Sequence, residues 1–198
     1  MDDALAALLA ALELKEERRT GWELREVTDP ESVAAHSWGV SLLVLVYGGD
    51  AGVDVDRALR MAVVHDLAEA ETGDVPTRVD PADQPVTADE KAAMEAQAIQ
   101  GLLGPFDGDL LARWEEYEAR ETPEAQFVKD MDLVEMCLQA LYYECEGRYP
   151  RDGANEAFEA FDALDEFFAT AEPRLRTDVG RSLFETIRSR YERARDDS

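Results

Sequence analysis

Helix-forming segments follow one another along almost the whole chain, and this feature limits the possible folds more than any other. No stretch shows the alternation of apolar and polar residues, bounded by turns, that marks a β-strand. The segments that we expect to be helical are residues 2–17, 30–47, 54–72, 87–103, 107–121, 124–146, 154–171 and 173–195. The pattern therefore predicts an all-α fold, a single bundle of about seven or eight helices.

Local signals mark some of the ends of these segments. The stretch Thr28-Asp29-Pro30-Glu31 offers a cap residue, a first-turn proline and a glutamate that could close a capping box, which predicts the start of the helix at 30–47. Three prolines, Pro76, Pro81 and Pro85, predict an irregular loop near residues 73–86.

The chain is one domain in size. Its 198 residues, 45% of them hydrophobic, are enough to build one core, and no repeat, low-complexity tract or linker divides them. We therefore expect a single domain over residues 1–198.

The charge excludes several kinds of partner. The 45 Asp and Glu residues against 20 Lys and Arg give a formal net charge of −25, without the clustered cations that nucleic acids or anionic membranes require. The longest apolar run, Val40–Tyr47, is far shorter than the roughly 20 residues of a membrane-spanning helix. The acidic start Met1-Asp2-Asp3 does not resemble a secretory signal. We expect a cytoplasmic protein that binds neither nucleic acid nor membranes.

Lysine is scarce among the cations, since Lys15, Lys91 and Lys129 are the lysines of the chain and the rest are arginines. Acid excess with few lysines resembles the proteins of microbes that keep molar salt in the cytoplasm. At about 1 M salt the Debye length falls to about 3 Å, which screens the repulsion between such charges. A high-salt cytoplasm is therefore one interpretation, and an ordinary acidic protein is the other.

The histidines are the residues most suited to chemistry. The chain has two, His36 and His65, each among apolar residues of an expected helix, and Asp66 follows His65 directly. A buried His-Asp pair is costly unless its polar groups find partners, and imidazole with carboxylate suits a divalent transition metal such as Mn, Fe, Co, Ni or Zn. A histidine hydrogen-bonded within the core is the alternative. Glu69 shares a helix face with His65 and could act as a general base, or it could be a solvated surface residue.

Four stretches, in this order, resemble the HD-domain hydrolases, and most closely the 5′-deoxynucleotidases among them. They are Glu31–Trp38, His65–Glu69, Gly73–Thr77 and Val128–Asp132, within a motif-bearing part at about 10–145 that precedes the C-terminal helices at 154–195. The resemblance implies a single HD-domain helical bundle, a homodimer, and hydrolysis of deoxyribonucleoside 5′-monophosphates to deoxynucleoside and phosphate. Hydrolysis of another small phosphoester, such as a nucleoside triphosphate or a cyclic nucleotide, and a non-catalytic module that binds metal or nucleotide are the alternatives.

The resemblance also implies the roles of individual residues. It assigns one divalent transition metal to His36, His65, Asp66 and Asp132, and it makes Glu69 the carboxylate that activates the attacking water. The residues implied in substrate binding are Arg19, Trp22, Asp74 and Thr77. Because no third histidine exists, we expect a mononuclear site.

The fourth metal ligand has two candidates on the expected helix 124–146. Asp130 lies nearer than Asp132 to the apolar stripe of an ideal helix, formed by Phe127, Met131, Val134, Leu138, Leu141 and Cys145. Further apolar residues make this helix apolar nearly all round, as in a buried central helix, so the stripe discriminates poorly. The resemblance selects Asp132, and periodicity alone selects Asp130.

Overall fold

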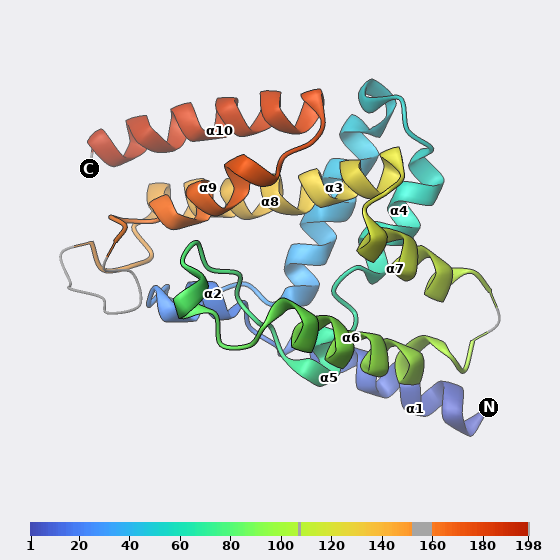
Figure 1. Cartoon of the computed structure of the whole chain (residues 1–198). Helices are drawn as coiled ribbons and strands as arrows, with labels where there is room; N and C mark the ends of the chain where they lie inside the picture. The colour runs from blue at the N-terminus through green and yellow to red at the C-terminus, as the bar shows by residue number, and fades with distance from the viewer. Residues whose placement is uncertain (107, 152–159, 198) are drawn as a thin grey trace.

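The computed structural model describes residues 1–106, 108–151 and 160–197, and within these ranges it is helical, with no β-strand (Figure 1). The α-helices are α1 (Asp2–Ala11), α2 (Thr20–Leu24), α3 (Val33–Ala51), α4 (Val55–Val64), α5 (Glu69–Thr72), α6 (Ala88–Leu103), α7 (Leu110–Ala119), α8 (Pro123–Glu146), α9 (Asp165–Ala171) and α10 (Asp178–Asp196). Short 3₁₀ turns lie at η1 (Leu12–Lys15), η2 (Pro81–Asp83) and η4 (Glu172–Arg174). The all-α prediction is confirmed.

The helix α8 forms the centre of the fold. It packs against α3, α4, α7, α9 and α10, and in Figure 1 α10 runs alongside it while α3 crosses it. Residues on every side of α8 are buried, including Phe127, Met131, Val134 and Cys137. A helix surrounded in this way must be apolar nearly all round. Below this group, α1, α5 and α6 pack together as a lower layer (Figure 1).

The helix α3 begins later than the sequence predicts. Ser32 is its N-cap, and the Ser32 side chain accepts a hydrogen bond from the backbone N–H of Ala35 at 3.2 Å. The prediction that Thr28–Glu31 would start this helix is wrong, because Glu31 is held in an extended segment where its carbonyl oxygen accepts from the N–H of Arg19. Such tertiary contacts compete with a local capping signal and here displace it.

The expected helix at 54–72 is broken in the middle. The helix α4 ends at Val64, and the chain makes i→i−3 hydrogen bonds from Leu67 to Val64 and from Glu69 to Asp66 before the short α5. These 3₁₀-type bonds place side chains three residues apart on the same face, so Asp66 and Glu69 come to lie on one side of the turn. The prediction of one continuous helix is therefore wrong at the histidine itself.

The C-terminal part also differs from its predicted bounds. In the expected helix 154–171, residues 152–159 lie outside the described residues, and the described part becomes helical only at Asp165. The expected helix 173–195 is divided into η4 and α10, and Thr177 caps α10 by accepting from the N–H of Gly180.

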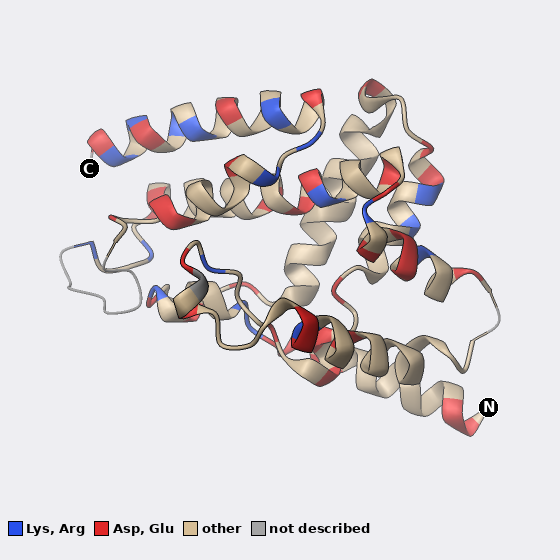
Figure 2. Ribbon diagram, viewed as in Figure 1, with Lys and Arg blue, Asp and Glu red and all other residues tan. Residues whose placement is uncertain are grey.

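Charge is unevenly distributed over the helices. Acidic and basic residues follow one another along α10, whereas α3 has almost no charged residues (Figure 2). Among the described residues, no helix combines the length and the apolar character needed to cross a lipid bilayer.

Candidate active site

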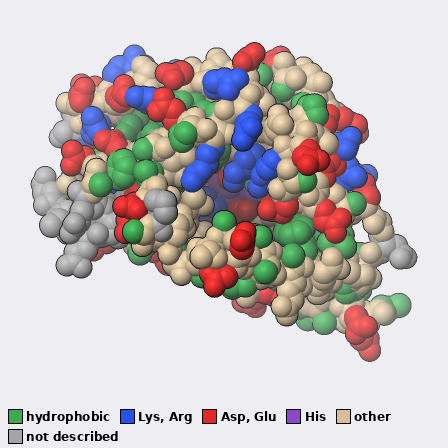
Figure 3. All heavy atoms as spheres, in the orientation of Figure 1, with side chains coloured by type: hydrophobic (Ala, Val, Ile, Leu, Met, Phe, Trp, Pro, Cys, Tyr) green, Lys and Arg blue, Asp and Glu red, His purple; other side chains and the backbone are tan. Residues whose placement is uncertain are grey.

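A cavity of about 270 Å³ opens between α2, the loop after α5, and the helices α6, α8 and α9. Figure 3 shows Lys and Arg side chains gathered around a hollow in the middle of this face. The residues that line the cavity are Arg19, Gly21, Trp22, Asp66, Glu69, Asp74, Val75, Pro76, Thr77, Arg78, Lys91, Lys129, Asp132, Leu133, Met136, Glu166, Phe167, Thr170 and Arg174.

Two buried histidines, His36 and His65, lie behind two carboxylates, Asp66 and Asp132, that line this cavity. His36 comes from α3, His65 and Asp66 from the turn after α4, and Asp132 from α8. The Nε2 atom of His36 lies 3.1 Å from Asp132 Oδ1 and 3.7 Å from Asp66 Oδ2, and Nε2 of His65 lies 3.2 Å from the same Asp66 oxygen. Donor atoms of His36, His65 and Asp132 all lie within 4.8 Å of one another. Three separate elements thus bring nitrogen and carboxylate oxygen donors around one point.

The outer nitrogen of each imidazole ring is engaged by the protein. Nδ1 of His65 donates to the carbonyl oxygen of Ala62 at 2.8 Å, and Nδ1 of His36 lies 2.5 Å from Glu135 Oε2. Such partners place a proton on Nδ1. Burial and Arg19 lower the pKa of His36, but Glu135 and Asp132 outweigh them and raise it to about 10, so in the metal-free protein Nε2 also carries a proton and donates it to Asp132. A bound metal would take the place of that proton. Nε2 of His65 is buried and makes no hydrogen bond with the described residues. This arrangement is typical of histidines that bind a metal.

Asp66 and Asp132 are held in the ionised form. Burial opposes ionisation, but His65 and His36 together hold the pKa of Asp66 well below its usual range. Burial is likewise outweighed at Asp132, where Lys129 and the two histidines keep the pKa well below its usual range. Asp132 Oδ2 accepts from Lys129 Nζ at 2.7 Å and from the Tyr117 hydroxyl at 3.0 Å. Two carboxylates of fixed orientation therefore face the histidines.

Glu69 is the most isolated acid of the cavity. It is 3% exposed, its Oε2 makes no hydrogen bond with the described residues, and its Oε1 lies 3.7 Å from Lys91 Nζ. Burial and repulsion from Asp66 and Asp74 raise its pKa well above the usual range. Lys91 also donates to the carbonyl oxygen of Val75 at 3.2 Å, so it ties α6 to the loop beside Glu69.

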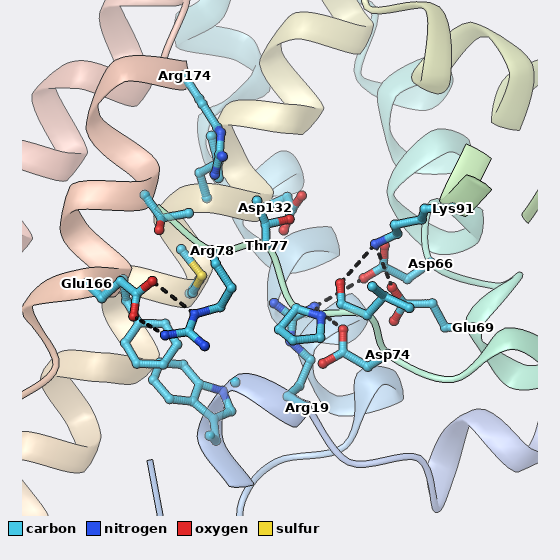
Figure 4. A pocket seen from close by; sticks show the side chains of 18 of the residues that line it. Arg19, Asp66, Glu69, Asp74, Thr77, Arg78, Lys91, Asp132, Glu166 and Arg174 are labelled. Atoms are coloured by element: carbon cyan, nitrogen blue, oxygen red, sulfur yellow. Dashed lines mark hydrogen bonds and ion pairs between the residues drawn. The ribbon is translucent and has the colours of Figure 1, made fainter. Parts of the chain in front are cut away.

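Arg19 and Asp74 lie beside the same cluster (Figure 4). Arg19 Nη1 is 3.4 Å from Asp66 Oδ2 and 3.9 Å from Asp74 Oδ1. Burial lowers the pKa of Arg19, but the surrounding carboxylates, Asp74 first, outweigh it and raise the pKa above its usual value. Asp74 Oδ2 accepts from the N–H of Thr20 at 2.5 Å, which fixes the loop against α2.

Trp22 and Thr77 both line the cavity, in different ways. Trp22 is 1% exposed and stacks on Phe167 with ring centroids 4.0 Å apart, while its Nε1 donates to Glu31 Oε1 at 3.1 Å. It is thus a fixed part of the wall. Thr77 is exposed on the loop at the mouth (Figure 4).

Asp130 lies away from the histidines, although it is completely buried. Its carboxylate accepts from the N–H of Arg176 at 2.9 Å, and from the N–H and hydroxyl of Thr177 at 2.6 and 2.7 Å. These donors use the oxygens of Asp130 to hold the start of α10. Asp132, two residues further along α8, is the acid that faces the cavity.

Several residues of the site carry no recognisable sequence signal. Arg78 on the loop makes two hydrogen bonds to Glu166 of α9, each 3.0 Å long, although the two residues are 88 positions apart. Tyr117 of α7 and Lys91 of α6 likewise reach the cluster from helices that the sequence motifs do not mark. Glu135 lies on α8, three residues after Asp132, but nothing in the motif indicates its contact with His36. No spacing rule relates such residues, so only the folded chain identifies them.

Comparisons with known proteins agree with this geometry. Residues 11–166 match the HD domain family. The chain is 37% identical over 177 residues to the 5′-deoxynucleotidase HDDC2 of Danio rerio, covering 87% of this chain and 80% of that protein. It is 40% identical over 136 residues to the 5′-deoxynucleotidase HDDC2 of Homo sapiens, covering 67% of this chain and 64% of the human protein.

Solved structures show the same fold. The PH0347 protein from Pyrococcus horikoshii superposes with a TM-score of 0.72 at 31% identity, covering 95% of this chain and 98% of that one. The HD phosphohydrolase DatZ of cyanophage S-2L, solved with dA and one catalytic Zn²⁺ ion, superposes with a TM-score of 0.60 at 26% identity, covering 96% of each chain. The family match covers most of the chain, and the histidines and aspartates gather in one cluster. This chain therefore belongs to the HD-domain family.

Proposed function

We propose that the protein is a metal-dependent phosphohydrolase that converts deoxyribonucleoside 5′-monophosphates to deoxynucleoside and phosphate. The observation that carries the proposal is the convergence of His36, His65, Asp66 and Asp132 beside a cavity that is lined by Asp66, Asp132, Glu69 and Arg19. The 5′-deoxynucleotidase relatives and the dA-bound DatZ structure support the choice of substrate class.

The two histidines and two aspartates fit one divalent transition metal ion. The buried Nε2 of His65 lies 3.2 Å from Asp66 Oδ2 but makes no well-aligned hydrogen bond with the described residues, so a metal ligated by both atoms would satisfy it. His36, Asp66 and Asp132 would complete the set. We prefer Asp132 to Asp130 because the oxygens of Asp130 are used by the start of α10. When bound, such an ion lowers the pKa of a water from about 15.7 toward about 7 and offsets negative charge on a phosphoryl group.

Glu69 is proposed as the general base. Its free Oε2 is buried at the cavity wall, so it can accept the proton that the attacking water loses as its oxygen bonds to phosphorus. Lys91 contacts the other oxygen of Glu69 and leaves Oε2 free for this role. The bond between phosphorus and the 5′ oxygen then breaks, and that oxygen takes up a proton to become the hydroxyl of the deoxynucleoside.

Arg19, Asp74, Thr77 and Trp22 are proposed to bind the nucleotide. The contacts of Arg19 Nη1 with Asp66 and Asp74, at 3.4 and 3.9 Å, are long for hydrogen bonds, so its guanidinium keeps capacity to donate to a phosphate. Asp74 and Thr77 offer oxygen atoms to the sugar. Trp22, packed by Phe167, offers an aromatic wall rather than a free stacking surface.

A substrate panel tests the proposal. The metal-loaded protein is assayed for phosphate release from deoxy- and ribonucleoside monophosphates, nucleoside triphosphates and cyclic nucleotides, at low and high salt. Release from deoxyribonucleoside monophosphates, with loss of both metal and activity in Asp66→Ala, is expected. Release from other phosphoesters alone, or no release with any divalent metal, would contradict the proposal and favour another hydrolase or a binding module. Elemental analysis of the purified protein identifies the native metal.

We also propose that the protein is a homodimer. Support comes from an apolar face of α3 on which Trp38 is 69% exposed, Leu45 54% and Val46 56%. Because α3 carries almost no charge, two copies could meet there without bringing like charges together. Light scattering on a size-exclusion column tests the assembly, with Trp38→Glu expected to yield monomer if this face is the interface. A wild-type monomer at micromolar concentration would contradict the proposal.

A cytoplasmic location with high internal salt is proposed from composition. The net charge of −25 and the scarcity of lysine support it. Such a protein should gain stability as KCl is raised from low to molar concentration, because screening weakens repulsion between its acids. Thermal unfolding over that range provides the measurement, and a melting temperature that does not rise would contradict the proposal.

A further inference from the structure

The cavity concentrates cations in a chain that has few of them. The chain has 20 Lys and Arg against 45 Asp and Glu. Five of these cations line the one cavity, namely Arg19, Arg78, Lys91, Lys129 and Arg174. The same cavity is lined by five acids, Asp66, Glu69, Asp74, Asp132 and Glu166, so its cations and acids balance, whereas acids outnumber cations in the whole chain. This balance makes the cavity the place where an anionic ligand meets least repulsion.

Four of the five cations have an acidic partner inside the protein. Arg19 contacts Asp66, Lys91 contacts Glu69, and Lys129 contacts Asp132. The fourth pair is the double hydrogen bond between Arg78 and Glu166. The positive charge of these four is therefore largely matched before any ligand enters.

Arg174 differs from the other four. It makes no hydrogen bond or ion pair with any residue in the described part of the chain, although it is half-buried and burial lowers its pKa. Its guanidinium is attracted by Asp132, which opposes the effect of burial, but no acceptor of the described residues is hydrogen-bonded to its five N–H donors, which are open to water or to an anion in the cavity. Figure 4 shows its side chain reaching into the cavity from the side opposite Arg19.

The position of Arg174 is held by the fold. Arg174 ends the 3₁₀ turn η4, which begins at Glu172 and contains Pro173. Directly after it, Leu175 is buried and the N–H groups of Arg176 and Thr177 donate to the carboxylate of Asp130. Asp130 therefore fixes the position of the segment that carries Arg174 beside the cavity.

We propose that Arg174, together with Lys129 of the same cavity lining, is a second phosphate-binding position of this cavity, on the wall opposite Arg19. A phosphate group supplies the oxygen acceptors and negative charge that the unpaired guanidinium lacks, and the planar fork of arginine can donate two parallel hydrogen bonds to it. The inference rests on the proposed function, because it takes the ligand to be a nucleotide. Its phosphate can come from two sources: the single phosphate of a monophosphate, or a further phosphate of a longer chain.

The test uses inorganic phosphate and tripolyphosphate as probes, measured by titration calorimetry with the full-length, metal-loaded protein. Arg174→Gln should weaken binding of at least one probe by about 10-fold, the usual loss when a charge-assisted hydrogen bond is removed. Arg174→Lys should recover part of the affinity because it restores the charge without the fork. The matched control is Arg176→Gln, which removes the same charge from an exposed side chain two residues away that does not line the cavity.

The two probes separate the two sources. If Arg174→Gln weakens the binding of phosphate and of tripolyphosphate equally, and raises KM for a monophosphate substrate by the same factor, Arg174 binds the reacting phosphate. A loss confined to tripolyphosphate assigns it to an additional phosphate. Unchanged binding of both probes in Arg174→Gln, or equal losses in Arg176→Gln, overturns the inference. Because binding is measured without turnover, a protein that binds phosphate through Arg174 yet hydrolyses no deoxyribonucleoside monophosphate would refute the proposed function alone.

Discussion

Gly39 is expected to be essential for the orientation of His36, one helical turn earlier on α3. A Cβ atom on Gly39 would lie 2.6 Å from Glu135 Oε1, 2.9 Å from its Cγ and 3.0 Å from its Cδ. Glu135 in turn holds Nδ1 of His36 at 2.5 Å. In Gly39→Ala the added methyl group must therefore displace the side chain that orients the proposed metal ligand.

The magnitude follows from two opposing effects. Replacing glycine by alanine inside a helix stabilises it by roughly 0.5–1 kcal/mol, whereas overpacking a filled site costs about 1–3 kcal/mol. Gly49 lies on the same helix, and a Cβ there would meet nothing within 4 Å, so Gly49→Ala should show the favourable effect alone. The two variants should thus differ by about 1–3 kcal/mol, or roughly 2–12 °C in Tm for a chain of this size.

Metal affinity provides the second measurement. Loss of a hydrogen bond to the outer nitrogen of a ligating histidine typically weakens metal binding about 10–100-fold. Competition with a chromogenic chelator should show this loss in Gly39→Ala and in Glu135→Met, which removes the acceptor without changing the backbone, and not in Gly49→Ala. If Gly39→Ala and Gly49→Ala melt at the same temperature and bind metal equally well, the reasoning about Glu135 and His36 is refuted.

Four further predictions follow from the site. Glu69→Gln should lower kcat by about 10²–10⁴-fold with unchanged metal content, and comparable loss of metal would argue against a general-base role. Asp132→Asn should lose metal, whereas Asp130→Asn should retain it and lower the free energy of unfolding by about 1–3 kcal/mol; elemental analysis and denaturation distinguish them. Burial and repulsion from Glu135 raise the pKa of Glu31 from the ordinary 4.5 to about 7. Between these two pH values the folded protein keeps a proton on Glu31 that the unfolded chain has lost, so the free energy of unfolding of the metal-free protein should fall as the pH rises from about 4.5 to 7. In Glu31→Gln the free energy of unfolding, measured by urea titration at each pH, should change less over this range. An unchanged dependence on pH would contradict the assignment to Glu31. The KM for a nucleotide should fall as salt is added from a low level, because the charge of −25 repels the substrate until it is screened, and a KM that only rises would count against this.

The fold class could be predicted from the sequence because its causes are local. Helical periodicity and the absence of strand patterns depend on neighbouring residues, and the all-α prediction is confirmed by α1 to α10. The rarity of histidine singles out His36 and His65 from the sequence alone, and the structure brings both together with Asp132 beside the cavity. The family resemblance was likewise carried by short stretches of chain, and the HD domain match confirms it.

Helix ends were less predictable, because tertiary contacts compete with local signals. Ser32, rather than Thr28–Glu31, caps α3 once Glu31 pairs with the segment at Arg19. The helix through His65 breaks where the side chain of His65 donates to a carbonyl oxygen of the turn before it. Neither outcome is encoded in the spacing of apolar residues.

The contacts between distant segments were decided by tertiary structure alone. The apolar stripe of an ideal helix favours Asp130 as the metal ligand. Because α8 is surrounded on all sides, the surroundings of each acid depend on which neighbour packs against it. Asp130 meets the start of α10, and Asp132 meets the histidines. The contact between His36 and Glu135 joins residues 99 positions apart, and the hydrogen bonds between Arg78 and Glu166 join residues 88 positions apart. Periodicity indicates that a face is buried but not what covers it, so the sequence determined the helices and the candidate ligands, and packing around α8 decided which charges meet at the cavity.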